Sequence, residues 1–355
     1  MSKLFEPLSV RELHLRNRVF LSPMCQYSAT DGFPTDWHFV HYGARAVGGV
    51  GLVMVEATAV APEGRITPHD LGIWSDAHGQ ALAALARFAR ASGAAAGIQL
   101  AHAGRKGSCD VPWRGGGRLP RDRGGWTTPA PSPVPFHPDD PLAEELAASA
   151  LPGLVAAYES AARRALDAGF QVVEIHMAHG YLLHAFLSPL SNRRRDSFGG
   201  SWENRARFPL DVVRAVRAVW PASLPVFVRL SVTDWVEGGW DPEQSVRLAR
   251  ELKAAGVDLV DCSSGGLVPD AKIPDAPGYQ VPFAARVRAG ARIATGAVGR
   301  ITDSAQAEEI VAGGSADAVS LGRELLRNPC WPLHAAAALG AQGAWPDPYL
   351  RARPV

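Results

Sequence analysis

Three side chains that can donate hydrogen bonds or protons follow one apolar stretch near the middle of the chain. His176, His179 and Tyr181 come directly after a β-branched run that ends at Ile175. If that run forms a strand, all three side chains leave the same strand end together. Such a group could hold the oxygen of a substrate as negative charge develops on it, and deliver a proton nearby.

The two histidines are open to other interpretations. His-x-x-His also occurs in metal sites, but no Asp, Glu or Cys after another predicted strand clearly completes a ligand set, and Glu56 is the nearest option. A pair of structural histidines is the other alternative. Tyr181 alone would be a weak candidate because tyrosines often pack through their rings, but beyond two histidines it becomes a candidate acid. We therefore predict a donor site without a metal ion.

The elements that must position these residues alternate along the chain. Apolar β-branched runs alternate with longer segments of helical periodicity, which is the pattern of βα units around a parallel sheet. The predicted strands are 18–21, 51–55, 96–100, 171–175, 225–230, 258–262, 291–295 and 316–321. The predicted helices are 37–47, 78–92, 151–168, 202–220, 242–255, 280–289, 304–312 and 329–339. Eight alternations, without GxGxxG after the first strand, favour an α/β fold of the (β/α)8 TIM-barrel type over an open sheet or two average domains. We expect one domain over 1–355, with an N-terminal hairpin.

The stretch 104–150 interrupts this alternation after the third strand. It is rich in Gly, Pro, Arg and Trp. In a barrel it would be a long loop on the face that carries catalytic residues, where such loops are often lids. We expect a capping segment, and a disordered surface insertion is the alternative.

Glycines follow the last three predicted strands. Gly265 and Gly266 follow the sixth strand, Gly296 the seventh, and Gly322 the eighth, with Arg323 next to it. Backbone N–H groups without side chains can approach a phosphate closely, and an arginine can add a charge-assisted contact. The pattern favours a phosphate site, although Gly322 could merely turn the chain and Arg323 could be solvated.

Three further residues lie at predicted strand ends. Arg229 ends an apolar strand, so its charge must be paired or point into a site, where it could stabilise negative charge on a reduced isoalloxazine ring. Gln99 could donate to and accept from one edge of a planar heterocycle. Either residue could instead be a buried structural group. Cys25 is a small core residue or a thiol that touches a cofactor ring, because no catalytic triad is legible.

The bulk composition narrows the classes of function. A net charge of +1 offers no field for nucleic acid or a membrane surface, and 47% hydrophobic residues supply ample material for a core. The four scattered cysteines indicate neither disulfides nor an iron–sulfur site. The start of the chain does not resemble a signal peptide, and no apolar run reaches about 18 residues. We predict a cytoplasmic protein whose partners are small molecules or other subunits.

Several motifs taken together resemble a known family. NRVFLSPMCQYSA, GIQLAHAGRK, FVRLSVTDW and SLGRELLRNP occur in this order, and HxxHGY is followed by LSPxxNxRxDxxGGSxENRxRF. The chain is similar over almost its whole length to the Old Yellow Enzyme family of FMN-dependent ene-reductases. Cys25, where the other main branch has threonine, indicates the thermophilic-like bacterial branch. The resemblance implies a barrel with tightly bound FMN at its mouth, NADPH as reductant, and an activated alkene (enone, enal, maleimide or nitroalkene) as substrate.

The resemblance also implies roles for individual residues. His176 and His179 match the pair that binds the carbonyl or nitro oxygen of the substrate, and Tyr181 matches the proton donor. Tyr27 matches a tyrosine of the substrate pocket, and Lys106 matches a basic residue near the cofactor entrance. The matching flavin contacts are Ser22, Pro23, Met24, Cys25, Ala57, Gln99, Arg229, Gly265, Gly266, Gly296, Gly322 and Arg323.

Members of this branch place a C-terminal arginine in the active site of a neighbouring subunit. Arg351 matches it within the tail 340–355, although Arg353 could take its part. The resemblance therefore implies a homodimer or homotetramer with a shared active site.

Other functions remain open at this point. Dienoyl-CoA reductases and amine dehydrogenases of the same fold carry a cysteine cluster and further cofactor domains, which we do not find in this sequence. A barrel aldolase would need a lysine at a strand end. A flavin protein used for sensing or storage would bind FMN without turnover.

Overall fold

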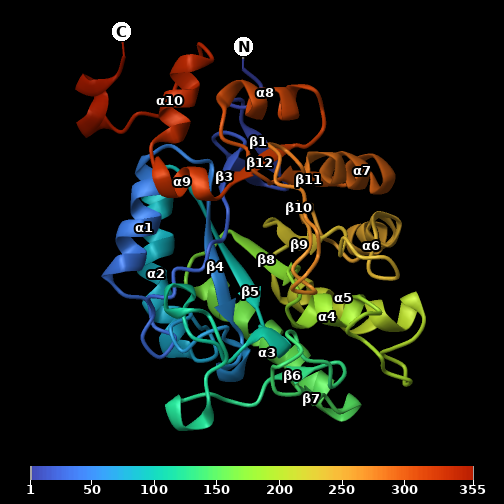
Figure 1. The fold of residues 1–355 in the computed structure, drawn as a ribbon. Helices are drawn as coiled ribbons and strands as arrows, with labels where there is room; N and C mark the ends of the chain where they lie inside the picture. Colours follow the sequence, from blue (N-terminus) through green and yellow to red (C-terminus); the bar gives the residue numbers. More distant parts are fainter. Residues whose placement is uncertain (1, 355) are drawn as a thin grey trace.

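A closed barrel of eight parallel strands forms the centre of the computed structural model, which describes residues 2–354 (Figure 1). The strands are β3 (Val19–Leu21), β4 (Leu52–Ala59), β5 (Ala95–Ala101), β8 (Val172–Met177), β9 (Val226–Ser231), β10 (Leu259–Ser263), β11 (Ala294–Ala297) and β12 (Ala318–Leu321). Each strand pairs with the next one along the chain, and β12 pairs with β3. This confirms the predicted (β/α)8 fold.

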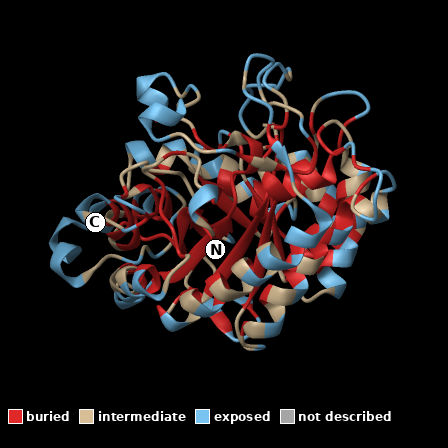
Figure 2. Ribbon diagram, turned by 90° about the horizontal axis from the view of Figure 1, so that it is seen from below, coloured by how far each residue is buried: buried red, intermediate tan, exposed pale blue. Residues whose placement is uncertain are grey.

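Helices surround the barrel and bury their apolar faces against it, so that the strands form the buried centre and exposed residues gather outside (Figure 2). The helices are α1 (Asp36–Val47), α2 (Asp76–Ala91), α3 (Leu151–Asp167), α4 (Leu182–Leu187), α5 (Trp202–Val219), α6 (Pro242–Ala254), α7 (Val281–Ala291), α8 (Ser304–Ala312), α9 (Arg323–Arg327) and α10 (Trp331–Ala338). Local signals set several of the helix starts. Asp241 accepts a hydrogen bond from the Gln244 N–H and Pro242 follows it, which is a favoured start for α6.

The predicted N-terminal hairpin is present and closes one end of the barrel. It consists of β1 (Leu8–Val10) and β2 (Leu13–Leu15), which pair antiparallel. Its buried side chains belong to the same apolar cluster as inward-facing residues near the strand starts, namely Phe20, Leu52, Val172, Phe227 and Leu259. The hairpin thus packs against the bottom of the barrel interior.

Two short helices were not predicted, and proline explains one of them. The predicted helix 329–339 is present as α10, but a separate short helix, α9, precedes it. Asn328 ends α9 outside the helical region, with φ at −134° and ψ at 87°, because the following Pro329 disfavours a helical residue before it. The second of these helices is α4, which begins directly after Tyr181, where no helix was predicted.

The stretch 104–150 contains short elements of its own. They are η2 (Gly104–Lys106), η3 (Pro112–Arg114), η4 (Arg121–Arg123), β6 (Pro129–Ala130), β7 (Glu144–Glu145) and η5 (Ala148–Ala150). In Figure 1 it is the teal to green stretch that reaches β6 and β7 beside one end of the barrel. No helix among residues 2–354 is both long enough and apolar enough to span a bilayer.

Candidate active site

The three predicted donors meet at the end of β8. His176 is the next-to-last residue of β8, His179 lies in the turn after it, and Tyr181 caps the start of α4. The ring centres of His176 and His179 are 5.2 Å apart, and those of His176 and Tyr181 are 5.1 Å apart. The Nε2 atom of His179 lies 2.7 Å from the Ser263 hydroxyl at the end of β10. The structure therefore brings these three rings together in one corner of the barrel mouth.

Burial fixes the protonation states of these groups. Burial, aided by the positive charge of Arg229, holds the pKa values of His176 and His179 well below the ordinary value. Burial also raises the pKa of Tyr181 well above its ordinary value. At neutral pH the site thus holds two neutral imidazoles and a protonated phenol. The Nδ1 atom of His176 has no hydrogen-bond partner among the described residues, which leaves it available to a ligand.

The loop after β3 faces this corner from the other side. Tyr27 adopts a left-handed backbone conformation, with φ at 49°. The N–H of Gln26 donates to the Glu56 carboxylate over 2.6 Å, which anchors the loop between Cys25 and Tyr27. Glu56 lies at a β-bulge in β4, and such bulges often re-aim a side chain next to an active site. No pattern in the sequence indicated this anchoring role of Glu56.

A layer of charged and polar side chains lies inside the barrel at mid-height. Gln99 donates to Glu174 over 2.7 Å, and Arg229 lies 3.4 Å from Asp261 and donates to the Ser22 hydroxyl over 3.0 Å. Burial, together with nearby Asp261, raises the pKa of Glu174 to about 8. The atom of Arg229 that faces Asp261 is Nε, and this contact is an ion pair without a well-aligned hydrogen bond. This layer presents the cation of Arg229 and the amide of Gln99 toward the mouth of the barrel.

A basic cleft of about 260 Å³ opens where the last strands end. Arg323 and Gly322, both expected there, line it together with Arg300, Gln280 and Tyr279. The amide of Gln280 accepts from the Ser264 hydroxyl over 2.6 Å and donates to the Val298 carbonyl over 3.1 Å, so it ties the ends of β10 and β11 together. The arginines and the glycine backbone make this cleft suitable for a phosphate.

A second cavity, of about 240 Å³, lies on the other side of the corner that holds His176, His179 and Tyr181. Tyr27 and Tyr181 line it, and much of its remaining wall comes from the stretch 104–150, including Phe136 and the turn 109–118. Trp113 packs edge-on against Tyr27 with ring centres 6.0 Å apart. The insertion is therefore part of the wall of this cavity.

Lys106 joins the insertion to the turn that carries His179. Its ammonium group donates to the backbone carbonyls of His179 and Gly266, each over 2.9 Å. Burial lowers the pKa of Lys106 to about 8. The side chain spans two strand-end loops, a role that its place in the sequence did not indicate.

Residues 3–342 match the sequence profile of the NADH:flavin oxidoreductase / NADH oxidase family. The chain belongs to this family. It is 50% identical over 350 residues to an NADPH dehydrogenase of Geobacillus thermodenitrificans, and the match covers 98% of each chain. It is 48% identical over 354 residues to an NADPH dehydrogenase of Listeria innocua, with 99% of each covered. The protein is thus an oxidoreductase.

Solved structures of this family share the fold. Morphinone reductase in complex with tetrahydroNAD superposes with a TM-score of 0.78 at 31% identity, covering 98% of this chain and 93% of that one. An old yellow enzyme homologue from Zymomonas mobilis superposes with a TM-score of 0.78 at 28% identity, covering 99% of each. The resemblance to the Old Yellow Enzyme family drawn from the motifs is confirmed.

The residues predicted to contact a flavin all lie in the C-terminal halves of barrel strands or in the segments directly after them. Four of them follow β3, single residues lie within β4, β5, β9 and β11, and the others follow β10 and β12. They are Ser22, Pro23, Met24, Cys25, Ala57, Gln99, Arg229, Gly265, Gly266, Gly296, Gly322 and Arg323. Sequence reasoning missed Gln280, Tyr279 and Arg300. The Gly299-Arg300 pair after the seventh strand was the available signal for the last of these.

Arg351 lies apart from this group. It is exposed, within the short turn η6 (Asp347–Ala352), and lines neither of the two cavities. Figure 1 shows this turn in red beyond α10, near the end of the chain.

Proposed function

We propose that this protein is an FMN-dependent ene-reductase that uses NADPH to reduce activated alkenes such as enones, enals, maleimides and nitroalkenes. The observation that carries the proposal is the convergence of two neutral histidines and a protonated tyrosine at one corner, between a basic cleft and a second cavity. The NADPH dehydrogenases among its relatives support the choice of reductant.

The residues present fit FMN. The guanidinium of Arg229 and the amide of Gln99 could meet the polar edge of the isoalloxazine ring. The cleft with Arg300, Arg323 and Gly322 could hold the phosphate. Gly322 faces Met24: a Cβ added to Gly322 would lie 3.4 Å from the Met24 sulfur, which is an ordinary van der Waals contact. When bound, FMN would accept hydride from NADPH and pass it to the β-carbon of the alkene.

The protein side chains then have separate tasks. His176 and His179 donate hydrogen bonds to the substrate oxygen and stabilise the negative charge that develops there, because each ring is neutral and buried. Tyr181 keeps its proton at neutral pH and delivers it from its hydroxyl to the α-carbon. Tyr27, Phe136 and Lys106 surround the substrate and help to exclude water.

The test is a purified protein with a visible flavin spectrum. Under anaerobic conditions NADPH should bleach the spectrum and 2-cyclohexenone should restore it. A protein that binds FMN and is reduced, yet is not reoxidised by any activated alkene, would instead support a role in sensing or storage. A colourless protein that takes up no FMN would refute the proposal.

We further propose that Arg351 completes the site of a neighbouring subunit in a homodimer or homotetramer. Its exposure and its place outside both cavities agree with such a role. Arg351→Ala should raise KM for the alkene, while Arg353→Ala should leave it unchanged. A monomer by light scattering would exclude a shared site.

A further inference from the structure

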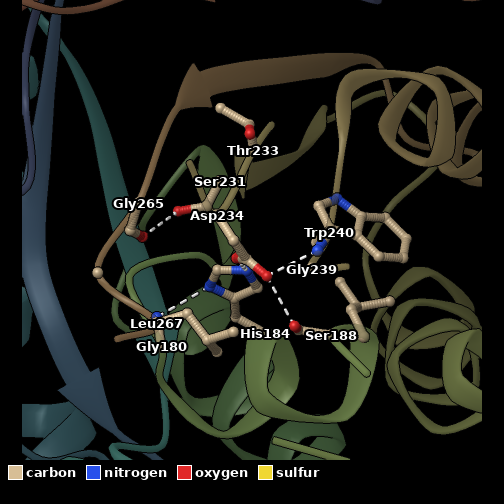
Figure 3. Close-up of polar contacts among 12 residues, drawn as sticks. Gly180, His184, Ser188, Ser231, Thr233, Asp234, Gly239, Trp240, Gly265 and Leu267 are labelled. Atoms are coloured by element: carbon tan, nitrogen blue, oxygen red, sulfur yellow. Dashed lines mark hydrogen bonds and ion pairs between the residues drawn. The ribbon is translucent and has the colours of Figure 1, made fainter. Parts of the chain in front are cut away.

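A buried histidine and aspartate lie behind the catalytic turn without touching either cavity. His184 and Asp234 are both fully buried, and His184 Nε2 lies 2.9 Å from Asp234 Oδ1. His184 belongs to α4, and Asp234 belongs to the loop after β9. Figure 3 shows the imidazole between the backbone of Gly180 and the carboxylate of Asp234. The pair therefore links two strand-end loops from beneath.

The histidine contacts the one residue that separates His179 from Tyr181. The N–H of Gly180 donates to His184 Nδ1 over 2.9 Å. Because Nδ1 accepts this hydrogen bond through its lone pair, it cannot carry a proton of its own, and the ring proton must reside on Nε2. A doubly protonated ring would aim an N–H at the N–H of Gly180. The geometry thus requires a neutral His184 in one tautomer.

Asp234 selects that tautomer. Its Oδ2 accepts from the Ser188 hydroxyl over 2.6 Å and from the Trp240 N–H over 2.7 Å, which leaves Oδ1 to face Nε2 of His184. Neither Nε2 nor Oδ1 has a well-aligned hydrogen-bond partner among the described residues, so the contact is chiefly electrostatic. A carboxylate held in this orientation favours the N–H at Nε2 and disfavours the other tautomer.

The turn that His184 supports needs such support. His179 has φ at 59°, a left-handed conformation that is unfavourable for a residue with a Cβ. Its N–H donates to the Ser231 hydroxyl over 2.9 Å, and its carbonyl accepts from Lys106. The contact from Gly180 to His184 holds the next peptide. The direction in which the His179 and Tyr181 rings leave the turn depends on these contacts.

We propose that His184, oriented by Asp234, is a positioning residue that fixes the peptide between His179 and Tyr181 and so sets the aim of both rings at the substrate. This inference rests on the proposed function. It predicts a selective defect: FMN stays bound while oxygen recognition and proton delivery suffer.

Two substitutions separate the two contacts of the ring. In His184→Asn, the side-chain oxygen can replace Nδ1 and accept from Gly180, while the contact to Asp234 is lost. In His184→Gln, the side-chain amide can replace Nε2 and reach Asp234, while Gly180 loses its acceptor. Ser191→Ala is the matched control, because it removes a buried hydrogen bond to the Ala185 carbonyl in the same region without touching the turn.

The readouts are those that a general loss of stability would not move. A para-substituted phenol serves as the oxyanion probe, and its affinity for the FMN-loaded protein is titrated through the long-wavelength absorption of the complex. The rate of reoxidation by 2-cyclohexenone is divided by the rate of reduction by NADPH. His184→Gln should weaken phenol binding and lower this ratio by about tenfold each, whereas His184→Asn should stay near wild type. FMN content and the melting temperature are recorded for all three variants.

Equal phenol affinity and an equal rate ratio in His184→Gln and wild type would overturn the proposal, and so would an equal defect in Ser191→Ala. If His184→Gln does not fold, the test is ¹⁵N NMR of the wild-type holoenzyme, labelled on its 11 histidines. One ring must show a proton on Nε2 and none on Nδ1 across neutral pH, and this signal must be absent from His184→Asn. A proton on Nδ1 of His184 would refute the proposal. Failure of enone turnover would refute the proposed function alone, because the tautomer and the phenol titration do not depend on it.

Discussion

Burial decides what the polar side chains of this site can do. His176 and His179 remain neutral donors because their surroundings exclude water and contain the charge of Arg229. Tyr181 keeps its proton for the same reason of burial. The residue types were legible in the sequence, but their protonation states depend on packing that only the fold supplies.

Tyr181→Phe should slow reoxidation by an enone by about 10²-fold or more, because it removes the proton donor while leaving the ring in place. Reduction by NADPH should change by no more than a few-fold. Stopped-flow absorbance of the flavin measures both steps. Tyr158→Phe is the control, since Tyr158 is a fully buried tyrosine of α3 outside the site. A larger loss in the reductive step would exclude Tyr181 as the donor.

Glu174 should make stability depend on pH. Its pKa is raised from 4.5 to about 8, so between these values the folded protein holds a proton that the unfolded chain has released. Its contribution to stability is therefore fully present at low pH and is lost as the pH rises toward 8. Glu174→Gln cannot ionise and still offers an acceptor to Gln99.

The free energy of unfolding of the flavin-free protein, measured in urea across this range, should fall with pH more steeply in wild type than in Glu174→Gln. The difference should amount to as much as about 4 kcal/mol. Parallel curves for the two proteins would contradict the protonated state assigned to Glu174.

At the residue scale, the sequence predicted those groups that leave strand ends in a recognisable motif. It missed residues that hold the loops of the site in place. Glu56, Gln280 and His184 each hold a loop through backbone or side-chain contacts, and no local pattern distinguishes them from ordinary polar residues. Their partners are distant in the chain or lie on a turn whose shape was unknown, so only tertiary structure reveals them.

At the scale of elements, strand identity was predictable because each strand is buried on both faces and reads as a short apolar run. The short helices α4 and α9 were not, because six and five residues are too few to show a helical period. The extension of β4 past residue 55 was missed because the bulge at Glu56 interrupts its pattern. The errors in the predicted helices and strands therefore lie mainly near the site, where the backbone is irregular.

The insertion should determine which alkenes fit. Phe136 lines the cavity of about 240 Å³, and its ring centre lies 4.2 Å from the Lys106 ammonium group. Phe136→Ala therefore enlarges this cavity. We expect kcat/KM for enones with a bulky substituent to rise several-fold relative to 2-cyclohexenone. Trp126→Ala is the control, since Trp126 belongs to the same insertion but does not line the cavity. An unchanged ratio would show that the substrate does not reach Phe136.

At the scale of the molecule, the barrel was predictable from the number of alternations, and the hairpin stabilises it at the end opposite to the chemistry. Leu15 is 1% exposed in the apolar cluster at the bottom of the barrel. Leu15→Ala should lower the free energy of unfolding by about 2–5 kcal/mol, whereas Leu8→Ala, at a partly buried position, should cost less. Denaturant titration measures both. Turnover of the folded protein should match wild type, and a selective loss of activity would show that the hairpin influences the site.

The close contact between Gly180 and Gly266 limits how the catalytic corner can be redesigned. A Cβ on Gly180 would lie 2.2 Å from the Gly266 carbonyl oxygen, and one on Gly266 would lie 2.7 Å from the His179 Cα. The two loops meet backbone to backbone, with no side chain between them that could shrink to make room. A mutant library for new substrates should therefore leave both glycines fixed and place its diversity in the wall formed by 109–118 and Phe136.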